Sequence, residues 1–115
     1  MLFIKNFREL IVYKQLLNIH QILLAEGLSH KELYEIRKDV CNIAGYIAQS
    51  QGTALYDGQS RVHLEKAIKW VNIFDRNIKD TNLSEEKKQK YKSYLGQIRR
   101  ILISLKNKLE VKEDE

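Results

Sequence analysis

Apolar residues recur every three or four positions in four stretches of the chain, and this spacing predicts four amphipathic α-helices. The first stretch, residues 4–26, has two neighbouring apolar rows, the main one formed by Phe7, Leu10, Ile11, Leu17 and Leu24 and the other by Val12, Leu16, Ile19 and Leu23. In the second, which ends near residue 51, the stripe is Leu33, Ile36, Val40, Ile43 and Ile47. The third and fourth have stripes of Leu64, Ala67, Ile68, Val71, Phe74 and Ile78, and of Tyr91, Leu95, Ile98, Leu102, Leu105 and Leu109.

Residue types that begin and end helices separate these stretches. Gly27 is the expected end of the first helix, because glycine enters the left-handed backbone conformation at little cost. Ser29 and Glu32 have the spacing of a capping box, in which each side chain accepts a hydrogen bond from an orphan backbone N–H. Ser60 is the expected cap of the third helix and Ser84 that of the fourth, while the segment GTALYDG separates the second helix from the third.

Four helices with short connections predict an all-α, up-down-up-down four-helix bundle. Five glycines and no proline among 115 residues agree with a few long helices. We expect one domain with a modest core, residues 1–109, followed by an acidic and disordered tail, residues 110–115.

The apolar stripes are wider than the seam of a single bundle requires. The first helix has its second apolar row, and Trp70 and Ile73 lie to one side of the main stripe of the third helix. One interpretation is a thick core within one subunit. The other, which we favour, is burial against another copy of the chain, with Trp70 and Ile73 at an oligomer or partner interface.

Charge is unevenly distributed along the chain. The net charge is +5, but the last six residues carry a formal −3, so the rest of the chain carries +8. Residues 87–109 hold eight Lys or Arg and no Asp or Glu, although an acid four residues before a lysine would stabilise a solvated helix. This excess of positive charge favours a polyanionic partner, since Lys and Arg bind phosphates and release their counterions.

On a helix, the basic residues of this segment separate by direction. A row beside the apolar stripe falls within about 40°, and its members are Lys88, Lys92, Arg99 and Lys106. We predict that phosphates are bound by this row together with Arg100, and that the positive field is strengthened by Lys87, Lys90 and Lys108. Tyr91 and Tyr94 point toward the core stripe, so little sequence preference is expected. The alternative is a solvated basic face that the acidic tail or other carboxylates neutralise.

Residue types that carry catalysis or bind metals do not cluster in the sequence. His20, His30 and His63 have no second ligand at metal-binding spacing, and no glycine-rich phosphate loop precedes a helix. Cys41 is expected to pack as a small hydrophobe rather than act as a nucleophile. We therefore expect no enzyme activity, metal or cofactor. One cysteine, no apparent signal peptide and no long apolar run favour a cytoplasmic protein without a membrane segment.

Segments along nearly the whole chain resemble one group of proteins. FRELIVYKQ and IRKDVCNIAGYIAQSQG are similar to the small bacterial four-helix bundle proteins encoded in intervening sequences of large ribosomal RNA genes, with matches at Ile43, Ile47 and Ala48. LYDGQSRVHLEKAIKWVNIF and LSEEKKQKYKSYLGQIRRILISL resemble the third and fourth helices of their relatives, the accessory variability determinants of diversity-generating retroelements, with matches at Ile98, Arg100 and Leu102.

The resemblance implies a homopentameric, barrel-like assembly of bundles with a basic surface. Accessory variability determinants bind nucleic acid with little sequence preference, associate with a reverse transcriptase and are needed for mutagenic retrohoming. We therefore expect a non-enzymatic nucleic-acid-binding accessory protein, in which Arg100 is the basic position that matches individually. Two alternatives remain open. One is a protein of the ribosomal intervening-sequence type, and the other is a protein-interaction module whose basic row binds an acidic partner.

Overall fold

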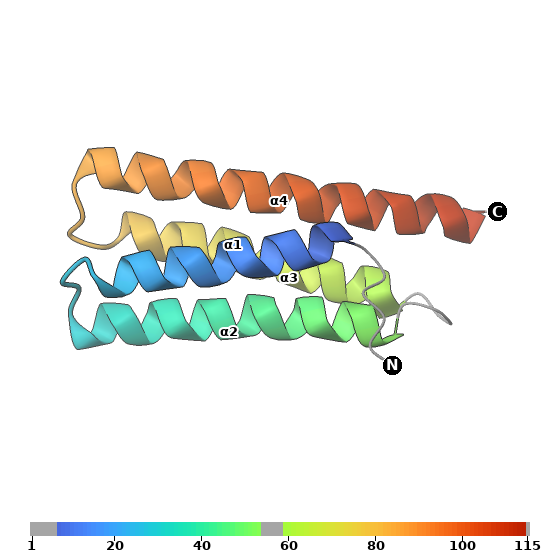
Figure 1. The fold of residues 1–115 in the computed structure, drawn as a ribbon, viewed down its shortest axis with the longest axis horizontal. Coiled ribbons are helices and arrows are strands. Elements are labelled where there is room, and N and C mark those ends of the chain that lie inside the picture. The colour runs from blue at the N-terminus through green and yellow to red at the C-terminus, as the bar shows by residue number, and fades with distance from the viewer. Residues whose placement is uncertain (1–6, 54–58, 115) are drawn as a thin grey trace.

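The computed structural model describes residues 7–53 and 59–114, and this part of the chain forms four α-helices without a strand (Figure 1). The helices are α1 (Phe7–Leu24), α2 (His30–Thr53), α3 (Gln59–Lys79) and α4 (Glu85–Asp114). Each helix packs against the next one in the chain, and α4 packs against α1, so the four enclose a common axis. The predicted all-α, four-helix fold is confirmed.

Capping interactions begin α2 and α4 where the sequence predicts them. The Ser29 N–H donates to Glu32 Oε1 at 2.9 Å and the Glu32 N–H donates to Ser29 Oγ at 3.2 Å, which confirms the capping box. At the start of α4, the Lys87 N–H donates to Ser84 Oγ at 3.3 Å. Gly27 has a φ of +75° after the end of α1, the conformation that glycine adopts most readily.

Three predicted boundaries differ from the structure. Ser60 is not the cap of α3, because α3 already begins at Gln59 and the buried Ser60 hydroxyl donates to the Ser50 carbonyl oxygen of α2 at 2.9 Å. Helix α2 continues to Thr53, past the expected end near residue 51. Helix α4 continues to Asp114, so the backbone of 110–114 is helical where the sequence predicts a disordered tail. Residues 1–6 and 54–58, which include most of the predicted GTALYDG break, lie outside the described residues.

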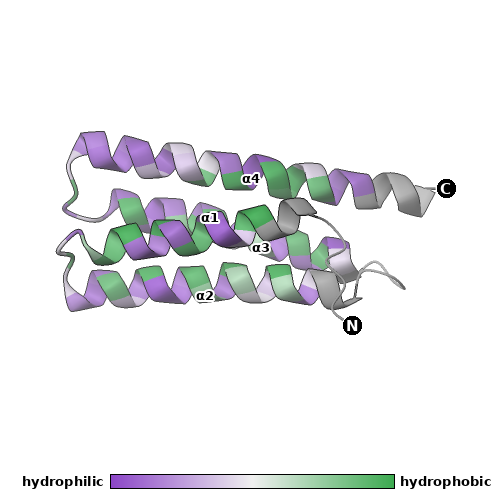
Figure 2. Ribbon diagram, viewed as in Figure 1, coloured by the Kyte–Doolittle hydropathy of each residue, from purple (hydrophilic) through white to green (hydrophobic). Residues whose placement is uncertain are grey.

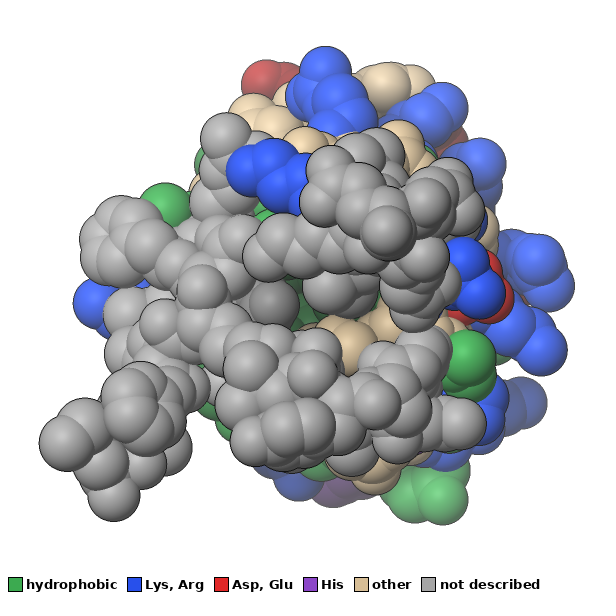
Figure 3. All heavy atoms as spheres, turned by 90° about the vertical axis from the view of Figure 1, so that its right-hand side faces the viewer, with side chains coloured by type: hydrophobic (Ala, Val, Ile, Leu, Met, Phe, Trp, Pro, Cys, Tyr) green, Lys and Arg blue, Asp and Glu red, His purple; other side chains and the backbone are tan. Residues whose placement is uncertain are grey.

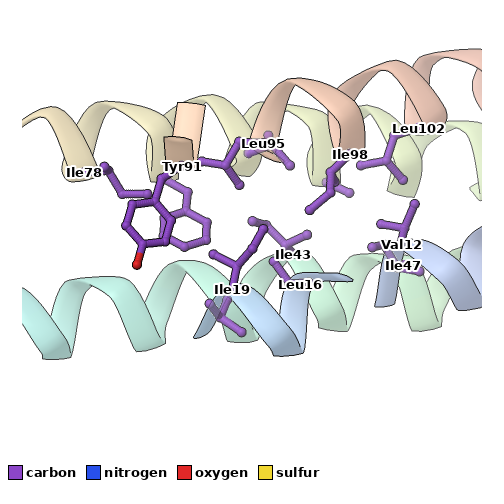
Figure 4. Packing of buried hydrophobic residues seen from close by; sticks show 14 of the residues in the cluster. Val12, Leu16, Ile19, Ile43, Ile47, Ile78, Tyr91, Leu95, Ile98 and Leu102 are labelled. Atoms are coloured by element: carbon purple, nitrogen blue, oxygen red, sulfur yellow. The ribbon is translucent and has the colours of Figure 1, made fainter. Parts of the chain in front are cut away.

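The core takes one apolar stripe from each helix and lies along the bundle axis (Figures 2 and 4). The predicted stripes of α2, α3 and α4 are buried where the structure describes them, apart from the partly exposed Leu33 and Ile68. In α1 the predicted main stripe is wrong, because Leu17 and Leu24 are 47% and 39% exposed. A bundle helix buries only the side that faces the axis, and in α1 this side carries Val12, Leu16, Ile19 and Leu23.

One carboxyl group is buried between α2 and α3. Asp39 is fully buried, and Asn77 Nδ2 donates to its Oδ2 at 2.6 Å. Asp39 Oδ1 has no hydrogen-bond partner among the described residues. Burial raises the pKa of the Asp39 carboxyl above its ordinary value, and the Asn77 hydrogen bond opposes this shift only in part.

The substitution Asp39→Asn is therefore expected to raise the free energy of unfolding at pH 7 by about 1 kcal/mol, because the amide keeps a bond to Asn77 and removes a buried charge. A raised pKa in the folded state means that Asp39 contributes most to stability below its unfolded pKa, near 3.8, and that this contribution is lost as the pH rises through the folded value. The advantage of the amide should thus shrink as the pH falls.

Urea unfolding of both proteins at pH 7 and at pH 4 measures this dependence. Asp80→Asn, the same change at an exposed position, is the matched control and should alter stability by less than about 0.5 kcal/mol. An Asp39→Asn protein that is less stable than the parent at pH 7, or whose advantage does not vary with pH, would contradict the assigned cause of the shift.

Candidate nucleic-acid interface

A solvent-open hollow lies between the C-terminal end of α3 and the first turns of α4. It has a volume of about 250 Å³ and is lined by Lys79, Glu85, Lys88, Gln89 and Lys92. The Lys88 ammonium donates to the backbone carbonyl oxygen of Lys79 at 2.8 Å and lies 3.9 Å from the Glu85 carboxylate. Lys79 and Lys92 are exposed. Three ammonium groups and one carboxylate thus share the hollow, a balance that favours an anion.

Farther toward the C-terminal end of α4, carboxylates of α3 face two more residues of the α4 row, Arg99 and Lys106. Arg99 Nη2 is 3.8 Å from Asp75 Oδ2, and Lys106 Nζ is 3.8 Å from Glu65 Oε1. Within the described part of the chain, Arg99 Nε and Asp75 Oδ1 are buried without a hydrogen-bond partner. The row is therefore partly neutralised by carboxylates elsewhere in the chain. Long, partly exposed contacts of this kind contribute little to stability, so they leave these cations able to exchange partners.

Helix α3 adds basic residues that the sequence analysis did not assign to this surface. Lys69, Arg76 and Lys79 are exposed and lie at positions i, i+7 and i+10, on one side of α3. Lys79 shares the hollow with Lys88 and Lys92, which places that side next to the α4 row. The charge of the segment alone does not reveal them, because α3 interleaves its lysines with Glu65 and Asp75. The helical register of α3 would have identified them.

We call these basic residues of the two neighbouring helices the α3–α4 basic face, which consists of Lys69, Arg76, Lys79, Lys88, Lys92, Arg99 and Lys106. In the end view of Figure 3, Lys and Arg side chains gather along the top and the right-hand side, with few Asp or Glu among them. The carboxylates that contact its cations are Glu65, Asp75 and Glu85, fewer than its seven Lys and Arg, so it retains a net positive charge.

Lys87 lies on the other side of α4 and already has a carboxylate partner. Its ammonium donates to Glu26 Oε1 at 2.9 Å, and the buried Tyr91 hydroxyl donates to Glu26 Oε2 at 2.9 Å. The Lys87 hydrogen bond holds the pKa of the Glu26 carboxyl below its ordinary value. Burial and the bond to Glu26 raise the pKa of the Tyr91 hydroxyl. This cluster attaches the start of α4 to the end of α1.

The other predicted basic residues of α4 also lie away from the α3–α4 basic face. Lys90 is exposed, and its ammonium lies 5.9 Å from the centroid of the Tyr94 ring. Lys108 is exposed and in helical register with Lys90, five turns farther along. Arg100 is exposed and, by register, points away from the bundle axis. The structure therefore places the eight predicted residues on several sides of α4, in agreement with their separation by direction in the sequence.

Most of the large exposed apolar residues lie on α1 and α2, and one more, Ile103, is 38% exposed on α4. Tyr13, Leu17 and Leu24 lie on one side of α1, and Tyr34 of α2 is 65% exposed. Trp70 and Ile73, the predicted interface residues, are only partly exposed, and Trp70 packs against the core.

Cys41 is exposed on α2, so the prediction that it packs as a small hydrophobe is wrong. It follows the buried Val40, and one residue along a helix turns the side chain by about 100°, out of the core.

His20 and His63 are partly buried, and His30 is exposed at the first position of α2. His20 faces α2, where burial and the nearby Arg37 lower the pKa of its imidazole. The His63 ring stacks on Tyr46 with 6.3 Å between centroids.

The described residues contain no group of three or more His, Cys, Asp or Glu that could bind a metal ion. In the same part of the chain, no helix combines the length and the apolar character needed to span a bilayer.

Comparisons of this chain with models of protein families, with curated proteins and with solved structures gave no significant match. The resemblance to intervening-sequence proteins and accessory variability determinants therefore stays a prediction from the sequence.

Proposed function

We propose that this protein is a non-enzymatic, oligomeric accessory protein that binds the phosphates of RNA or DNA along the α3–α4 basic face. The observation that supports this most is the hollow shared by Lys79, Lys88 and Lys92, because it joins basic residues of two helices into one anion-binding surface. Lys92 is exposed there, and Lys88 is held by a backbone carbonyl and a long contact to Glu85.

The length of the basic face suits a nucleic acid strand. From Lys88 to Lys106 the α4 row extends over about 27 Å, at 1.5 Å per residue. Phosphates of one strand follow one another at about 3.4 Å along a duplex axis, so several can lie against the row at once. Lys and Arg contacts to phosphate carry no sequence information, so we expect affinity with little sequence preference.

The partners follow from the resemblance. We infer a reverse transcriptase as the protein partner and a homopentamer as the assembly, as in accessory variability determinants. The exposed apolar residues on one side of α1, Tyr13, Leu17 and Leu24, support self-association, since apolar side chains gathered on one side of a helix indicate an interaction surface.

Fluorescence anisotropy with a generic RNA and a generic DNA, repeated over a salt series, tests the proposal. We expect binding at low salt and a linear fall of log K with log salt, with a slope of about −0.7 to −0.9 for each phosphate neutralised. A slope of about −3 or steeper is expected if the exposed cations of the face act together. No binding of either nucleic acid at low salt would contradict the proposal.

A protein-interaction module is the second candidate. The apolar side of α1 and Tyr34 of α2 favour it, because neither contributes to a phosphate-binding surface. In that case the α3–α4 basic face would bind an acidic protein, and RNA would not compete with it.

A further inference from the structure

A second pocket lies between α1 and α4, on the side of α4 opposite the α3–α4 basic face. It has a volume of about 180 Å³ and is lined by Gln15, Asn18, Ile19, Tyr94 and Gln97. All five side chains are uncharged. This lining therefore differs in chemistry from the lysine-lined hollow and favours a neutral ligand that forms hydrogen bonds.

The lining combines three carboxamides with an aromatic ring. Gln15 Oε1 is buried and has no hydrogen-bond partner among the described residues. Leaving a buried acceptor without a donor is costly, and such groups in a pocket are satisfied when a ligand or water supplies the donor. Asn18 and Gln97 are exposed at the pocket and offer further amide donors and acceptors.

The size and chemistry of the pocket match a nucleobase. An apolar cavity of about 150 Å³ accommodates benzene, so a pocket of this volume accommodates a planar heterocycle, particularly as it is open on one side. Asn and Gln side chains pair with the donor and acceptor atoms of base edges, and aromatic side chains stack on base faces. Tyr94 packs against the core, as the sequence predicts, but it is also partly exposed and lines the pocket, where it contributes the aromatic ring.

An exposed cation lies beside the aromatic ring of the pocket. Lys90 is exposed and its ammonium is 5.9 Å from the centroid of the Tyr94 ring. We propose that the α1–α4 pocket binds one unpaired nucleobase, with Gln15, Asn18 and Gln97 on its edge, Tyr94 on its face and Lys90 on the attached phosphate. The base can come from a single strand, which rests on the proposed function, or from a free nucleotide, which does not.

Titration of the ¹⁵N-labelled protein with AMP, CMP, GMP and UMP, followed by NMR, tests the pocket directly. We expect at least one nucleotide to shift the side-chain amide signals of Gln15, Asn18 and Gln97, and ribose 5-phosphate to leave them unchanged. Tyr94→Leu, which keeps an apolar side chain, should weaken that nucleotide about tenfold. Gln97→Ala should weaken it as well, whereas Gln21→Ala, an exposed glutamine of α1 outside the pocket, should not.

Two results would overturn the inference. One is that no nucleotide shifts the pocket amides at 10 mM (a concentration chosen to detect weak binding). The other is that ribose 5-phosphate or an unrelated anion shifts them as strongly as a nucleotide does. Neither result affects the salt-dependent binding of RNA and DNA to the α3–α4 basic face, so failure of the pocket and failure of the proposed function are distinguishable.

An oligonucleotide with one 2-aminopurine identifies the source of the base. If the pocket takes a base from a strand, the single-stranded probe changes its fluorescence with the parent protein, changes less with Tyr94→Leu, and the duplex probe responds to neither. If mononucleotides bind but the single-stranded probe does not respond, the pocket is specific for free nucleotides. Both outcomes support a nucleobase site and assign its source.

Discussion

Replacing Lys69, Arg76 and Lys92 together by glutamate is expected to lower the affinity for RNA at physiological salt by about 100-fold or more. All three side chains are exposed on the α3–α4 basic face. Each substitution removes a cation that neutralises a phosphate and adds a charge that repels it. The dependence of log K on log salt should also become less steep by about 0.7 to 0.9 for each lost phosphate contact.

A matched control separates the position of these charges from the net charge. Lys14, Lys31 and Lys38 are exposed on α1 and α2, and their replacement by glutamate changes the net charge by the same amount. Lys38 forms a solvent-exposed ion pair with Glu35, whose loss costs little stability. The control should lose less than about tenfold in affinity. Equal losses in both variants would show that net charge, not the α3–α4 basic face, decides binding, and no loss in the first variant would show that the assigned face is wrong.

Helix boundaries were predictable where a short local motif fixes them. The capping box at Ser29 and Glu32 and the cap at Ser84 depend only on residues three positions apart, so the sequence alone identifies them. Ser60 has the same chemistry but a different role. Its hydroxyl binds the carbonyl oxygen of Ser50, ten residues earlier, and this bond exists only because α2 and α3 are antiparallel neighbours.

The buried side of α1 could not be chosen from periodicity. Its two apolar rows are both at helical spacing, and only the positions of α2 and α4 decide which one faces the axis. Val12 and Leu16 face it and are fully buried, while Leu17, one residue later, is 47% exposed. In α2, by contrast, there is a single apolar row, and exposed charged residues such as Arg37 and Lys38 lie off it. The predicted stripe of Ile36, Val40, Ile43 and Ile47 is accordingly buried.

The candidate site was predictable only in part, because charge compensation depends on packing between helices. The 100° spacing places Lys88, Arg99 and Lys106 on one side of α4, and the structure places that side against α3. The partners Asp75 and Glu65 lie more than 20 residues away in sequence. A search for an acid-free segment cannot find them, nor can it find the basic residues that α3 adds to the same face.

The two sides of α4 have different chemistry, and this difference gives the helix two proposed roles. The α3 side carries the cations that we assign to phosphates, and the α1 side carries Tyr94 and Gln97 of the α1–α4 pocket. Between these two sides of α4, Tyr91 is fully buried, and its hydroxyl donates a hydrogen bond to Glu26 at 2.9 Å. A substitution at Tyr91 is therefore expected to affect the fold, whereas substitutions on either side should affect one binding activity at a time.

Replacing Leu17 and Leu24 by glutamate is expected to convert an oligomeric parent protein into a monomer. Both side chains lie on the exposed side of α1, together with Tyr13, and neither belongs to the buried core. Two carboxylates placed in an apolar interface would have to lose their hydration without gaining a partner, and this cost exceeds what a modest interface supplies. Because both sites are exposed within one subunit, the free energy of unfolding of the isolated bundle should change little.

Size-exclusion chromatography with light scattering measures the mass of each variant, and far-UV circular dichroism verifies its helix content. Ile73→Glu is the comparison variant, because Ile73 and Trp70 are the interface residues predicted from the sequence. Dissociation by Ile73→Glu alone would place the interface on α3 instead of α1, and a monomeric parent would contradict the proposed assembly.

The monomeric variant keeps its α3–α4 basic face but contacts RNA through one subunit. The loss of multivalency should lower the apparent affinity for a long RNA by about 10²-fold or more, while the affinity for a short oligonucleotide should be unchanged.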